Sequence, residues 1–531
     1  MNQKITYLIL LSIAGGVITA LAWFPGCTGL VTLFSLVPFF ILAEITEPND
    51  KKFGNRLLFI RILPGFLAFN IVALAWIRIA GYPLLVTAVA GNSFIMAFTF
   101  WLAWTVLQKA GKILGNISYI ILWLAMEYAT NNLAILSPWL NMGNSLAKNT
   151  SLIQWYEYTG VAGGTAWILS VNMMTAGLIM SISARVKRSI IIRNSIITLF
   201  LVFIPPALSL LVTKSTDFQT SNDKPSEVLV IQPCIDPYTD KFSTPFISQL
   251  DEIILTARAN ATENTSWIVT PETVIDDPIN LGEMESDIYV NRIRELLAGY
   301  PNAVFILGAT TYTPGTDTTL HNSAIMIDAG GPVAYYHKSK LVPGIEKSFS
   351  GLFSFMQHLF PYLGGTGAGY TGQKSPTLLE NPADGSSAAP VICFESAFGG
   401  HVSQFVREGA GIIIIITNDG WWKNTYGYYQ HLTLSSIRAI ESRRPVVRAA
   451  NTGISAIISP TGVITSQLPW WEPGTIKASV QPGKKITFYV RYGDMAGRVA
   501  STMALFILLI HIVAIPFRKR FSQKKSATDA T

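Results

Sequence analysis

Long apolar runs crowd the first two-fifths of this 531-residue chain and recur once near its C-terminus. Each run approaches or reaches the length that a helix needs to cross a bilayer. Seven runs precede residue 213 and an eighth follows residue 495, at residues 5–23, 29–43, 57–77, 84–107, 117–129, 161–182, 195–212 and 499–517. The pattern predicts a membrane α-helical bundle of about eight transmembrane helices, interrupted by one long stretch of different character.

The interruption divides the chain into four expected parts. They are a transmembrane region of seven helices at residues 1–212, an extracytoplasmic α/β domain at 213–495, an eighth transmembrane helix at 496–517 and a basic cytoplasmic tail at 518–531. We expect the tail to lack regular structure. The first run is similar to a signal peptide, but a second apolar run follows at once, so we expect an uncleaved first span.

Basic residues are sorted unevenly among the loops between the runs. They follow the second, fourth, sixth and eighth runs, as Lys51, Lys52, Arg56, Lys109, Lys112, Arg185, Lys187, Arg188, Arg193, Arg518, Lys519, Arg520, Lys524 and Lys525. Because basic loops stay in the cytoplasm, we expect both termini there and the α/β domain outside. The net charge of +7 is then a membrane-edge feature. The domain has no basic stripe with interleaved aromatics, so no nucleic-acid partner is expected.

Within the α/β domain, short apolar runs alternate with amphipathic helical patterns. The strand candidates are residues 227–232, 266–270, 303–308, 322–328, 390–393, 411–417, 446–451 and 454–459. Residues 246–257 and 293–297 carry apolar side chains at helical spacing. This alternation predicts a layered α/β domain in which helices cover a sheet.

Three of these strand ends carry residues whose burial is costly unless they are paired. Glu272 follows one strand, Lys338 follows the hairpin that begins at 322–328, and Cys393 ends a third strand. Taken alone, each residue also has an ordinary structural explanation. Cys393 could be a packed core residue, Glu272 a surface turn residue and Lys338 a solvated strand end. Together they supply what a thiol nucleophile needs, which is a base and a cation for a developing oxyanion.

The motifs "TPETVID", "YHKSKLVPGIEKS" and "VICFES" contain these residues in that order. They resemble the Glu-Lys-Cys triad of the nitrilase, or carbon-nitrogen hydrolase, superfamily. The multiple apolar runs and the segment at 417–462, "TNDGWWKNTYGYYQHLTLSSIRAIESRRPVVRAANTGISAIISPTG", are similar to the apolipoprotein N-acyltransferase family. The resemblance implies an extracytoplasmic nitrilase-like α-β-β-α sandwich domain on a bundle of eight spans.

The resemblance also implies a role for each triad residue. Cys393 would be the nucleophile, Glu272 the general base and Lys338 the oxyanion-stabilising cation. Supporting or substrate-binding positions near the pocket would be Glu346, Phe394, Glu395 and Trp421. The family often has tyrosine after the cysteine, so Phe394 indicates that a hydroxyl is not essential there. The sequence "VPGIE" departs from the usual "VPFGE", which bears on the exact placement of Glu346.

The implied reaction moves an acyl chain from a phospholipid donor, through a cysteine thioester, to the N-terminal amine of a diacylated apolipoprotein acceptor. Such an enzyme would be a multi-pass protein of the bacterial inner membrane, with membrane lipid as a partner and its catalytic domain in the periplasm. No cofactor is implied, and the six histidines lack metal-ligand spacing, so no metal is expected.

Two other functions remain open at this stage. One is a membrane-tethered nitrilase-type amide hydrolase, in which water resolves the acyl-enzyme. The other is a transporter-like protein with a structural outer domain, although the spans lack paired breaks. The apolar segment 350–365 predicts a lid that dips into the membrane, and a packed insertion is its alternative.

Overall fold

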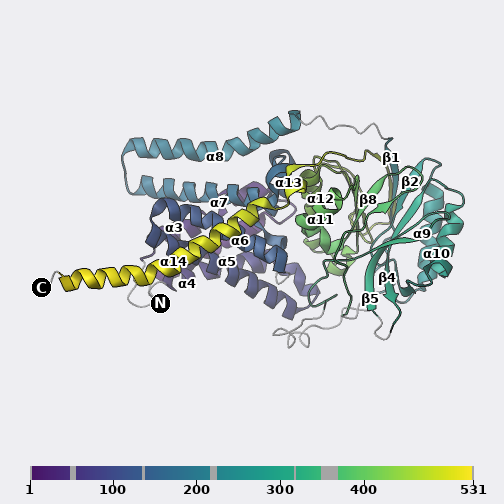
Figure 1. The fold of residues 1–531 in the computed structure, drawn as a ribbon, viewed down its shortest axis with the longest axis horizontal. Helices are drawn as coiled ribbons and strands as arrows, with labels where there is room; N and C mark the ends of the chain where they lie inside the picture. Colours follow the sequence, from purple (N-terminus) through teal and green to yellow (C-terminus); the bar gives the residue numbers. More distant parts are fainter. Residues whose placement is uncertain are drawn as a thin grey trace.

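The computed structural model describes residues 3–47, 56–133, 138–215, 224–315, 319–347 and 369–528. A helical bundle forms one end of the molecule and two β-sheets form the other (Figure 1). Three helices lie between them, namely α11 (Gly399–Arg407), α12 (Gly427–Ser442) and α13 (Phe488–Tyr492). Both ends of the chain lie at the end of the bundle that is remote from the sheets. The predicted segment 350–365 lies outside the described residues.

The bundle is built from the apolar runs. Its longer helices are α1 (Gln3–Leu21), α3 (Val37–Ile45), α4 (Leu57–Leu74), α5 (Tyr82–Ala110), α6 (Lys112–Leu133), α7 (Tyr156–Ser183), α8 (Arg188–Ser215) and α14 (Met495–Thr528). Within the described residues, five segments are long and apolar enough to cross a membrane: Leu57–Ile79, Tyr82–Lys109, Lys112–Asn132, Tyr156–Ser183 and Arg188–Lys214. The other apolar segments of the described residues, Thr6–Leu21, Gly29–Ile45 and Met495–His511, are shorter, so the count of eight spans stays a prediction.

Two sequence expectations about the bundle were wrong in detail. The run at 29–43 is not one helix but a 3₁₀ turn (Gly29–Val31), a short helix α2 (Thr32–Ser35) and α3. The break falls at Leu36, two residues before Pro38, and helix α3 has this proline in its first turn. The tail expected to lack regular structure continues α14 to Thr528.

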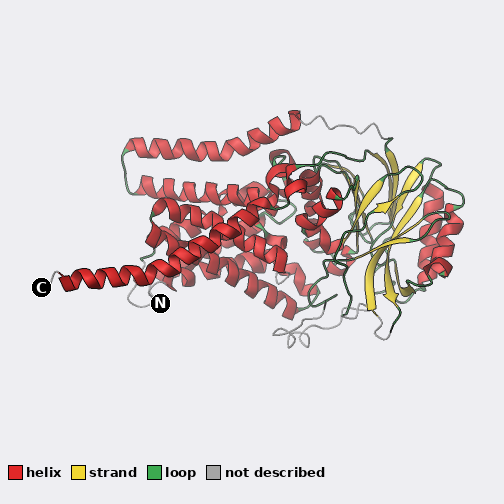
Figure 2. Cartoon of the chain, viewed as in Figure 1, coloured by secondary structure: helices red, strands yellow, loops and turns green. Residues whose placement is uncertain are grey.

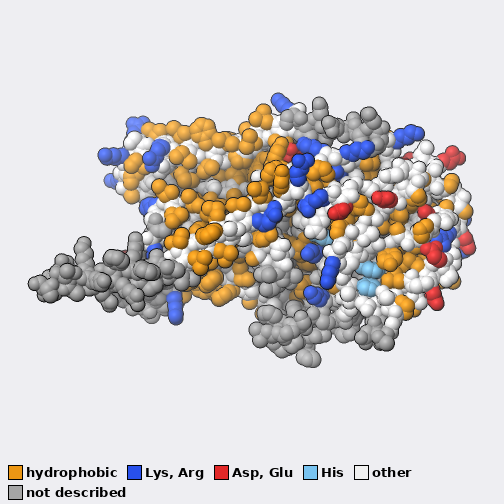
Figure 3. Space-filling view, viewed as in Figure 1, with side chains coloured by type: hydrophobic (Ala, Val, Ile, Leu, Met, Phe, Trp, Pro, Cys, Tyr) orange, Lys and Arg blue, Asp and Glu red, His pale blue; other side chains and the backbone are white. Residues whose placement is uncertain are grey.

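Apolar side chains cover much of the face of the bundle that Figure 3 shows. On α8 they include Ile192, Ile196, Ile197, Leu199, Phe200, Phe203, Ile204, Leu208, Leu210 and Leu211, all exposed. Basic side chains gather at the turn that joins α7 to α8, which lies at the end remote from the sheets. Because so broad an apolar surface is unfavourable in water, it indicates a lipid environment for the bundle.

The α/β domain contains two twisted sheets packed face to face (Figure 2). The first has the order β13-β1-β2-β4-β5-β6, with β3 also paired to β4. Its strands are β1 (Ser226–Gln232), β2 (Thr265–Val269), β3 (Ile275–Asn280), β4 (Val304–Thr313), β5 (Thr319–Ile327), β6 (Ala334–His337) and β13 (Gly474–Val480). The second has the order β12-β11-β10-β9-β8-β7. Its strands are β7 (Leu379–Glu380), β8 (Ser387–Ile392), β9 (Ile412–Thr417), β10 (Val446–Ala450), β11 (Ala456–Ile458) and β12 (Ile464–Gln467).

Helices cover both outer faces of this pair of sheets. Helices α9 (Phe246–Asn260) and α10 (Ile288–Leu297) pack on the first sheet through one apolar cluster. Residues of both sheets, α11 and α12 share a second cluster. The predicted α-β-β-α sandwich is therefore confirmed. The opposite face of α12 joins the core of the bundle through Leu434, Ile437 and Ile440, so α12 belongs to both halves of the molecule.

Candidate active site

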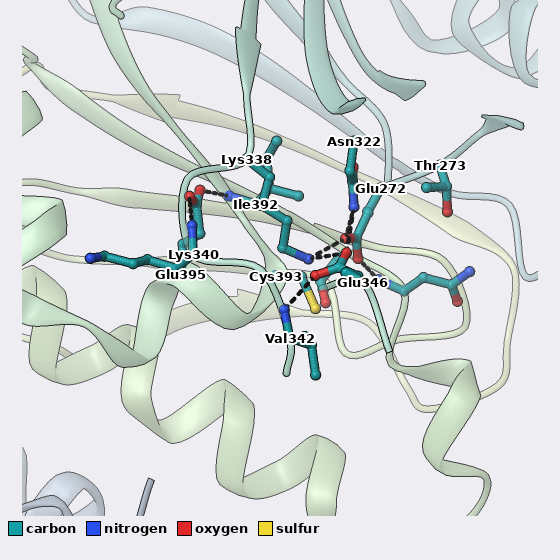
Figure 4. A network of polar contacts seen from close by, with 12 residues as sticks. Glu272, Thr273, Asn322, Lys338, Lys340, Val342, Glu346, Ile392, Cys393 and Glu395 are labelled. Atoms are coloured by element: carbon teal, nitrogen blue, oxygen red, sulfur yellow. Dashed lines mark hydrogen bonds and ion pairs between the residues drawn. The ribbon is translucent and has the colours of Figure 1, made fainter. Parts of the chain in front are cut away.

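The carboxyl ends of three strands from the two sheets meet at one place. Glu272 lies three residues beyond β2, Lys338 directly follows β6, and Cys393 directly follows β8. Their side chains point toward one another although they are far apart in the chain (Figure 4). All three are buried, Lys338 to 1% exposure and Glu272 to 7%. The fold thus brings together the three residues that the sequence motifs indicated.

Cys393 occupies a sharp turn between β8 and helix α11. Its φ of 51° lies in the left-handed region, which costs a non-glycine residue on the order of 1–3 kcal/mol. The short 3₁₀ turn η9 (Cys393–Ala397) begins at this residue. Such strain persists only where surrounding contacts hold it.

Glu395 supplies some of these contacts from within the turn. One carboxylate oxygen accepts bonds from the backbone N–H of Ser339 (2.6 Å) and from the hydroxyl of Tyr336 (2.7 Å). The other accepts the backbone N–H of Ile392 at 2.9 Å. Glu395 is fully buried and does not line the cavity described below. It therefore ties the strand ends that carry Lys338 and Cys393 to each other.

Lys338 forms two ion pairs in the middle of the site. Its ammonium lies 2.9 Å from Oε1 of Glu272 and 2.8 Å from Oε1 of Glu346. Asn322 donates to the same two oxygens, at 2.9 and 2.8 Å. An ammonium group has three donors, and the third has no acceptor among the described residues. That donor is free for a negatively charged oxygen in the cavity.

The placement of Glu346 is fixed despite the unusual "VPGIE" sequence. Its second carboxylate oxygen accepts the backbone N–H of Val342 at 2.8 Å, so the loop folds back on itself. Gly344 has a φ of 78° in this loop, a conformation that glycine adopts at low cost. Glu346 is therefore held beside Lys338 by its own loop.

A close approach of two backbones positions Glu272. A Cβ atom added to Gly308 in β4 would lie 2.5 Å from the Cα of Glu272 and 2.3 Å from the backbone nitrogen of Thr273. The backbone N–H of Gly308 also donates to the carbonyl of Pro271 at 2.9 Å. Only glycine fits at this point, and the turn that carries Glu272 rests directly on β4.

The pKa of Glu272 and the pKa of Cys393 are shifted in opposite directions. Burial alone would raise the pKa of Glu272, but the Lys338 ammonium and its hydrogen bonds hold that pKa below its usual value. Burial and the nearby Glu272 carboxylate raise the pKa of the Cys393 thiol well above its ordinary value. Burial would lower the pKa of Lys338, but Glu272 and Glu346 raise it. The resting site therefore holds a carboxylate, an ammonium and a neutral thiol, with the carboxylate ready to accept the thiol proton.

A cavity of about 250 Å³ opens beside Cys393. Its polar wall contains Glu272, Asn322, Lys338, Glu346 and Cys393. Its apolar wall comes from the bundle, through Leu74, Trp76, Ile77, Ala80, Leu84, Ala88, Trp139 and Leu140, and from Phe394, Trp421 and Trp422 of the domain. Of the four predicted supporting positions, Phe394, Trp421 and Glu346 line the cavity and Glu395 does not.

Sequence reasoning missed two polar partners of Glu272. Asn322 is 2% exposed and bridges the two glutamates, and the backbone N–H of Asn418 donates to Oε2 of Glu272 at 3.2 Å. Each asparagine lies at the end of an apolar strand run, which was the available signal. Among the described residues no group of three or more His, Cys, Asp or Glu side chains could hold a metal ion.

Two family matches cover most of the chain. Residues 219–485 match the family described as carbon-nitrogen hydrolase, and residues 15–174 match the one described as apolipoprotein N-acyltransferase N-terminal domain. The curated relatives include the apolipoprotein N-acyltransferase of Chlorobaculum tepidum, 28% identical over 500 residues, which are 90% of this chain and 91% of that protein. The apolipoprotein N-acyltransferase of Geobacter metallireducens is 28% identical over 388 residues, or 71% of each protein.

Among solved structures, an amidase from Nesterenkonia sp. is 15% identical, covers 51% of this chain and 94% of its own, and has a TM-score of 0.36. The carbon-nitrogen hydrolase match spans half of the chain, and the chain belongs to that family. Within it, the chain has the two-part organisation of the apolipoprotein N-acyltransferases, with their N-terminal domain preceding the hydrolase-like domain.

Proposed function

We propose that this protein is an N-acyltransferase that carries a fatty acyl chain from a membrane phospholipid to the N-terminal amine of a diacylglyceryl-cysteine on an apolipoprotein. The observation that carries the proposal is the shared lining of one cavity. Glu272, Lys338 and Cys393 face the same space as apolar residues of α4 and α5, two helices long enough to cross a membrane. A site built for water-soluble amides has no need of such a wall.

In the first half-reaction, the sulfur of Cys393 attacks the ester carbonyl of the phospholipid while its proton passes to Glu272. The third donor of Lys338 stabilises the oxyanion of the tetrahedral intermediate. Collapse of the intermediate breaks the ester C–O bond and leaves a thioester. The departing lysophospholipid oxygen takes the proton from Glu272.

In the second half-reaction, the free amine of the acceptor attacks the thioester carbonyl and passes a proton to Glu272. Lys338 again faces the oxyanion, and collapse breaks the C–S bond. The thiolate recovers its proton from Glu272, and the product is an amide. Two bulky lipid-bearing substrates can therefore use one site in turn.

The experiment separates a transferase from the alternative amide hydrolase. Purified protein incubated with phospholipid alone should accumulate an acyl group on Cys393, identified by mass spectrometry, and release little free fatty acid. The apolar cavity wall favours exclusion of the water that would hydrolyse the thioester.

A diacylglyceryl-cysteinyl peptide with a free amine should then discharge the acyl group as an amide, and an N-blocked peptide is the matched control that should not. Steady release of fatty acid without acceptor would favour the hydrolase, and an unmodified Cys393 would exclude both.

We also propose the finer localisation, a bacterial inner membrane with the α/β domain in the periplasm and both termini in the cytoplasm. Two observations support it. Basic residues follow alternate apolar runs, and both chain ends lie at the end of the bundle opposite the sheets (Figure 1).

A further inference from the structure

A second cavity lies between the bundle and the α/β domain. Among the described residues, it shares no lining residue with the cavity beside Cys393. Its volume is about 290 Å³, near the lower end of the range of about 300–1,000 Å³ that small-ligand sites have. Its walls come mainly from α6, α7, α11, α12, α13 and the start of α14. Helices α11, α12 and α13 place it at the level where the bundle meets the sheets (Figure 1).

The lining of this second cavity carries charges of both signs. Its basic side chains are those of Lys340, Arg407, Arg438 and Arg498. Its acidic side chains are those of Glu127, Glu441 and Asp494. Because a ligand's charges must complement those of its site, a wall of this kind suits a polar ligand that carries both charges.

Two of these charged groups are already occupied within the protein. Arg407 donates through Nε and Nη2 to the carbonyl of Val490, at 3.0 and 2.8 Å. Glu127 accepts hydrogen bonds at both of its carboxylate oxygens. The groups that remain for a ligand are therefore on α12, at the start of α11 and at the start of α14.

Arg438 and Glu441 of α12 form an incompletely paired ion pair, although each is only 2% exposed. Nη2 of Arg438 lies 3.2 Å from Oε2 of Glu441. Nε of Arg438 and Oε1 of Glu441 have no hydrogen-bond partner among the described residues. A buried polar atom without a partner is costly, and more so when its group is charged. A ligand that offers an acceptor to the guanidinium and a donor to the carboxylate would remove this cost.

The first turn of α11 rests directly against this ion pair. A Cβ atom added to Gly399 would lie 2.2 Å from Nη1 of Arg438 and 2.7 Å from Oε2 of Glu441. Gly399 and Gly400, which open the nine-residue helix α11, both line the cavity. The first N–H groups of a helix lack intrahelical partners and favour an anion. Arg438 and the start of α11 therefore form an anion-binding side of the cavity.

Residues of α13 and α14 form an exposed rim. Arg498 and Tyr492 line the cavity and are exposed, Tyr492 to 47%. Asp494, which also lines it, directly precedes α14. Exposed apolar side chains continue from this rim along α14, among them Met495, Val499, Met503 and Phe506. Acyl chains can lie along such a surface while a head group occupies the cavity.

We propose that the second cavity binds the head group of a membrane phospholipid that carries both a phosphate and an ammonium, as phosphatidylethanolamine does. The phosphate faces Arg438, Arg498 and the first turn of α11, and the ammonium faces Glu441 and Asp494. This lipid is a bound component and not the acyl donor, because its cavity is separate from the one beside Cys393. It joins α11, which follows the turn that carries the nucleophile, to α14 of the bundle.

The first test counts bound lipid in a protein that cannot be acylated at position 393. Full-length Cys393→Ala protein in detergent is titrated with phosphatidylethanolamine and followed by native mass spectrometry. Adding Arg498→Gln should weaken the binding of one lipid about tenfold, since a charge-assisted hydrogen bond to the phosphate is lost. Arg491→Gln is the matched control, because Arg491 is exposed on α13 and does not line the cavity. Equal lipid occupancy in the two variants overturns the proposal.

The second test asks whether the cavity recognises the ammonium. The Cys393→Ala protein should bind phosphatidylethanolamine about tenfold more tightly than phosphatidylglycerol, which has a phosphate and no ammonium. Adding Asp494→Asn should reduce this preference to within about twofold. The asparagine oxygen can still accept the N–H of Gly497, which Asp494 accepts at 2.7 Å, so α14 keeps its first turn. Equal binding of the two lipids before this change would contradict the zwitterionic assignment.

The third test separates a lipid from a soluble ester. Phosphatidylethanolamine should raise the Tm of the Cys393→Ala protein, and the rise should be smaller when Arg498→Gln is added. Phosphoethanolamine at the same concentration should leave the Tm unchanged, because it has no acyl chains to lie along α14. Equal protection by both compounds would assign the cavity to a soluble ester, and protection by neither would leave it to water; each result counts against the proposal. Acyl transfer takes no part in these tests, so they decide the proposal even if the proposed function fails.

Discussion

At the scale of single residues, the site keeps charged side chains buried by pairing Lys338 with Glu272 and Glu346. Three ionisable groups share a buried site, and the proposed first step requires a carboxylate, an ammonium and a thiol that can give up its proton. The ammonium of Lys338 stabilises the carboxylate of Glu272, and the thiol of Cys393 stays neutral because it is buried and because Glu272 lies beside it. Under the proposed mechanism, the Cys393 thiol therefore gives its proton to Glu272 only during attack on a substrate.

The first prediction concerns that nucleophile. Cys393→Ala should abolish acyl transfer, and Cys393→Ser should lose at least about 1,000-fold because a hydroxyl is far harder to deprotonate than a thiol. Acyl transfer is measured with labelled phospholipid, and thermal unfolding checks that the fold persists. Turnover close to wild type in the alanine variant would remove Cys393 from the mechanism.

The second prediction follows from the lowered pKa of Glu272. As a base, Glu272 works when ionised, and a depressed pKa keeps it ionised until the pH falls below the ordinary glutamate range. The wild-type rate of Cys393 acylation should therefore be level between pH 5.5 and about 8. Glu272→Gln should lower it roughly 100-fold to 10,000-fold, and the exposed Glu380→Gln should not change it. A wild-type rate that falls tenfold between pH 7 and 5.5 would contradict this assignment.

The depressed pKa also links pH to stability. Ionised Glu272 adds to the free energy of unfolding above its unfolded-state pKa near 4.5. This stabilisation is lost as the pH falls through the lower pKa of the folded state.

The sequence motifs singled out Glu272, Lys338 and Cys393, which the fold places side by side, and their catalytic roles stay predictions. The sequence did not indicate the polar groups behind them. Glu272, Lys338 and Cys393 each end a recognisable strand, and their motifs are adjacent to prolines or glycines that mark turns. His431 carries no such local mark, because its partners Asp419 and Arg448 lie on other elements and meet it only in the fold. The sequence therefore does not indicate these contacts.

At the scale of elements, all eight strand candidates correspond to strands, whereas several edge strands were missed. The central strands are continuous apolar runs, of which β9 is the clearest, because both faces are buried. Strand β3 contains Pro278 and two aspartates, and β13 has alternating exposure at the edge of its sheet. Neither composition distinguishes an edge strand from a loop, since edges tolerate polar residues and proline.

The contact between β4 and the Glu272 turn gives a prediction at this scale. Gly308→Ala would force a methyl group against the backbone of Glu272, so both the melting temperature and the rate of Cys393 acylation should fall. A destabilisation of about 1–3 kcal/mol is expected from thermal unfolding. Gly315→Ala is the control, because nothing lies within 4 Å of its added Cβ. If the two variants melted at the same temperature and were acylated at the same rate, the close contact between β4 and the Glu272 turn would not restrict the residue at position 308.

Helix α5 supplies a second prediction at the scale of elements. Leu84 lines the cavity, and Leu84→Ser should weaken contact with a long acyl chain by on the order of 1.5 kcal/mol, raising the KM for long-chain phospholipid roughly tenfold. A donor with a short acyl chain should be affected little. Val86→Ser on the same helix is the control, since Val86 is 63% exposed and does not line the cavity. Similar losses for both chain lengths would place the acyl chain elsewhere.

At the scale of the whole molecule, side-chain contacts as well as the chain itself join the bundle to the α/β domain. Arg443, after α12, pairs with the buried carboxylate of Glu157 in α7 and donates to the carbonyl of Gln154 at 2.8 Å. Gln430 of α12 accepts the indole N–H groups of Trp76 and Trp139 at 3.1 and 2.7 Å. These contacts fix the domain against the bundle and hence the polar wall of the cavity against its apolar wall.

Topology gives the last prediction. A reporter fused after Phe517 should score as cytoplasmic, and one inserted near Asp317 should score as outside, because basic residues mark the cytoplasmic loops. Alkaline phosphatase and a fluorescent protein report the two sides. The same side for both positions would refute the proposed orientation.

The dual membership of α12 has a consequence for synthesis in the cell. The cavity acquires its apolar wall only when Trp76, Leu84 and Trp139 are in place, and α12 needs the bundle to cover Leu434, Ile437 and Ile440. A domain that has emerged from the ribosome but has not joined its helices therefore lacks a finished site. We therefore expect acyl transfer to begin only after the bundle and the α/β domain have assembled.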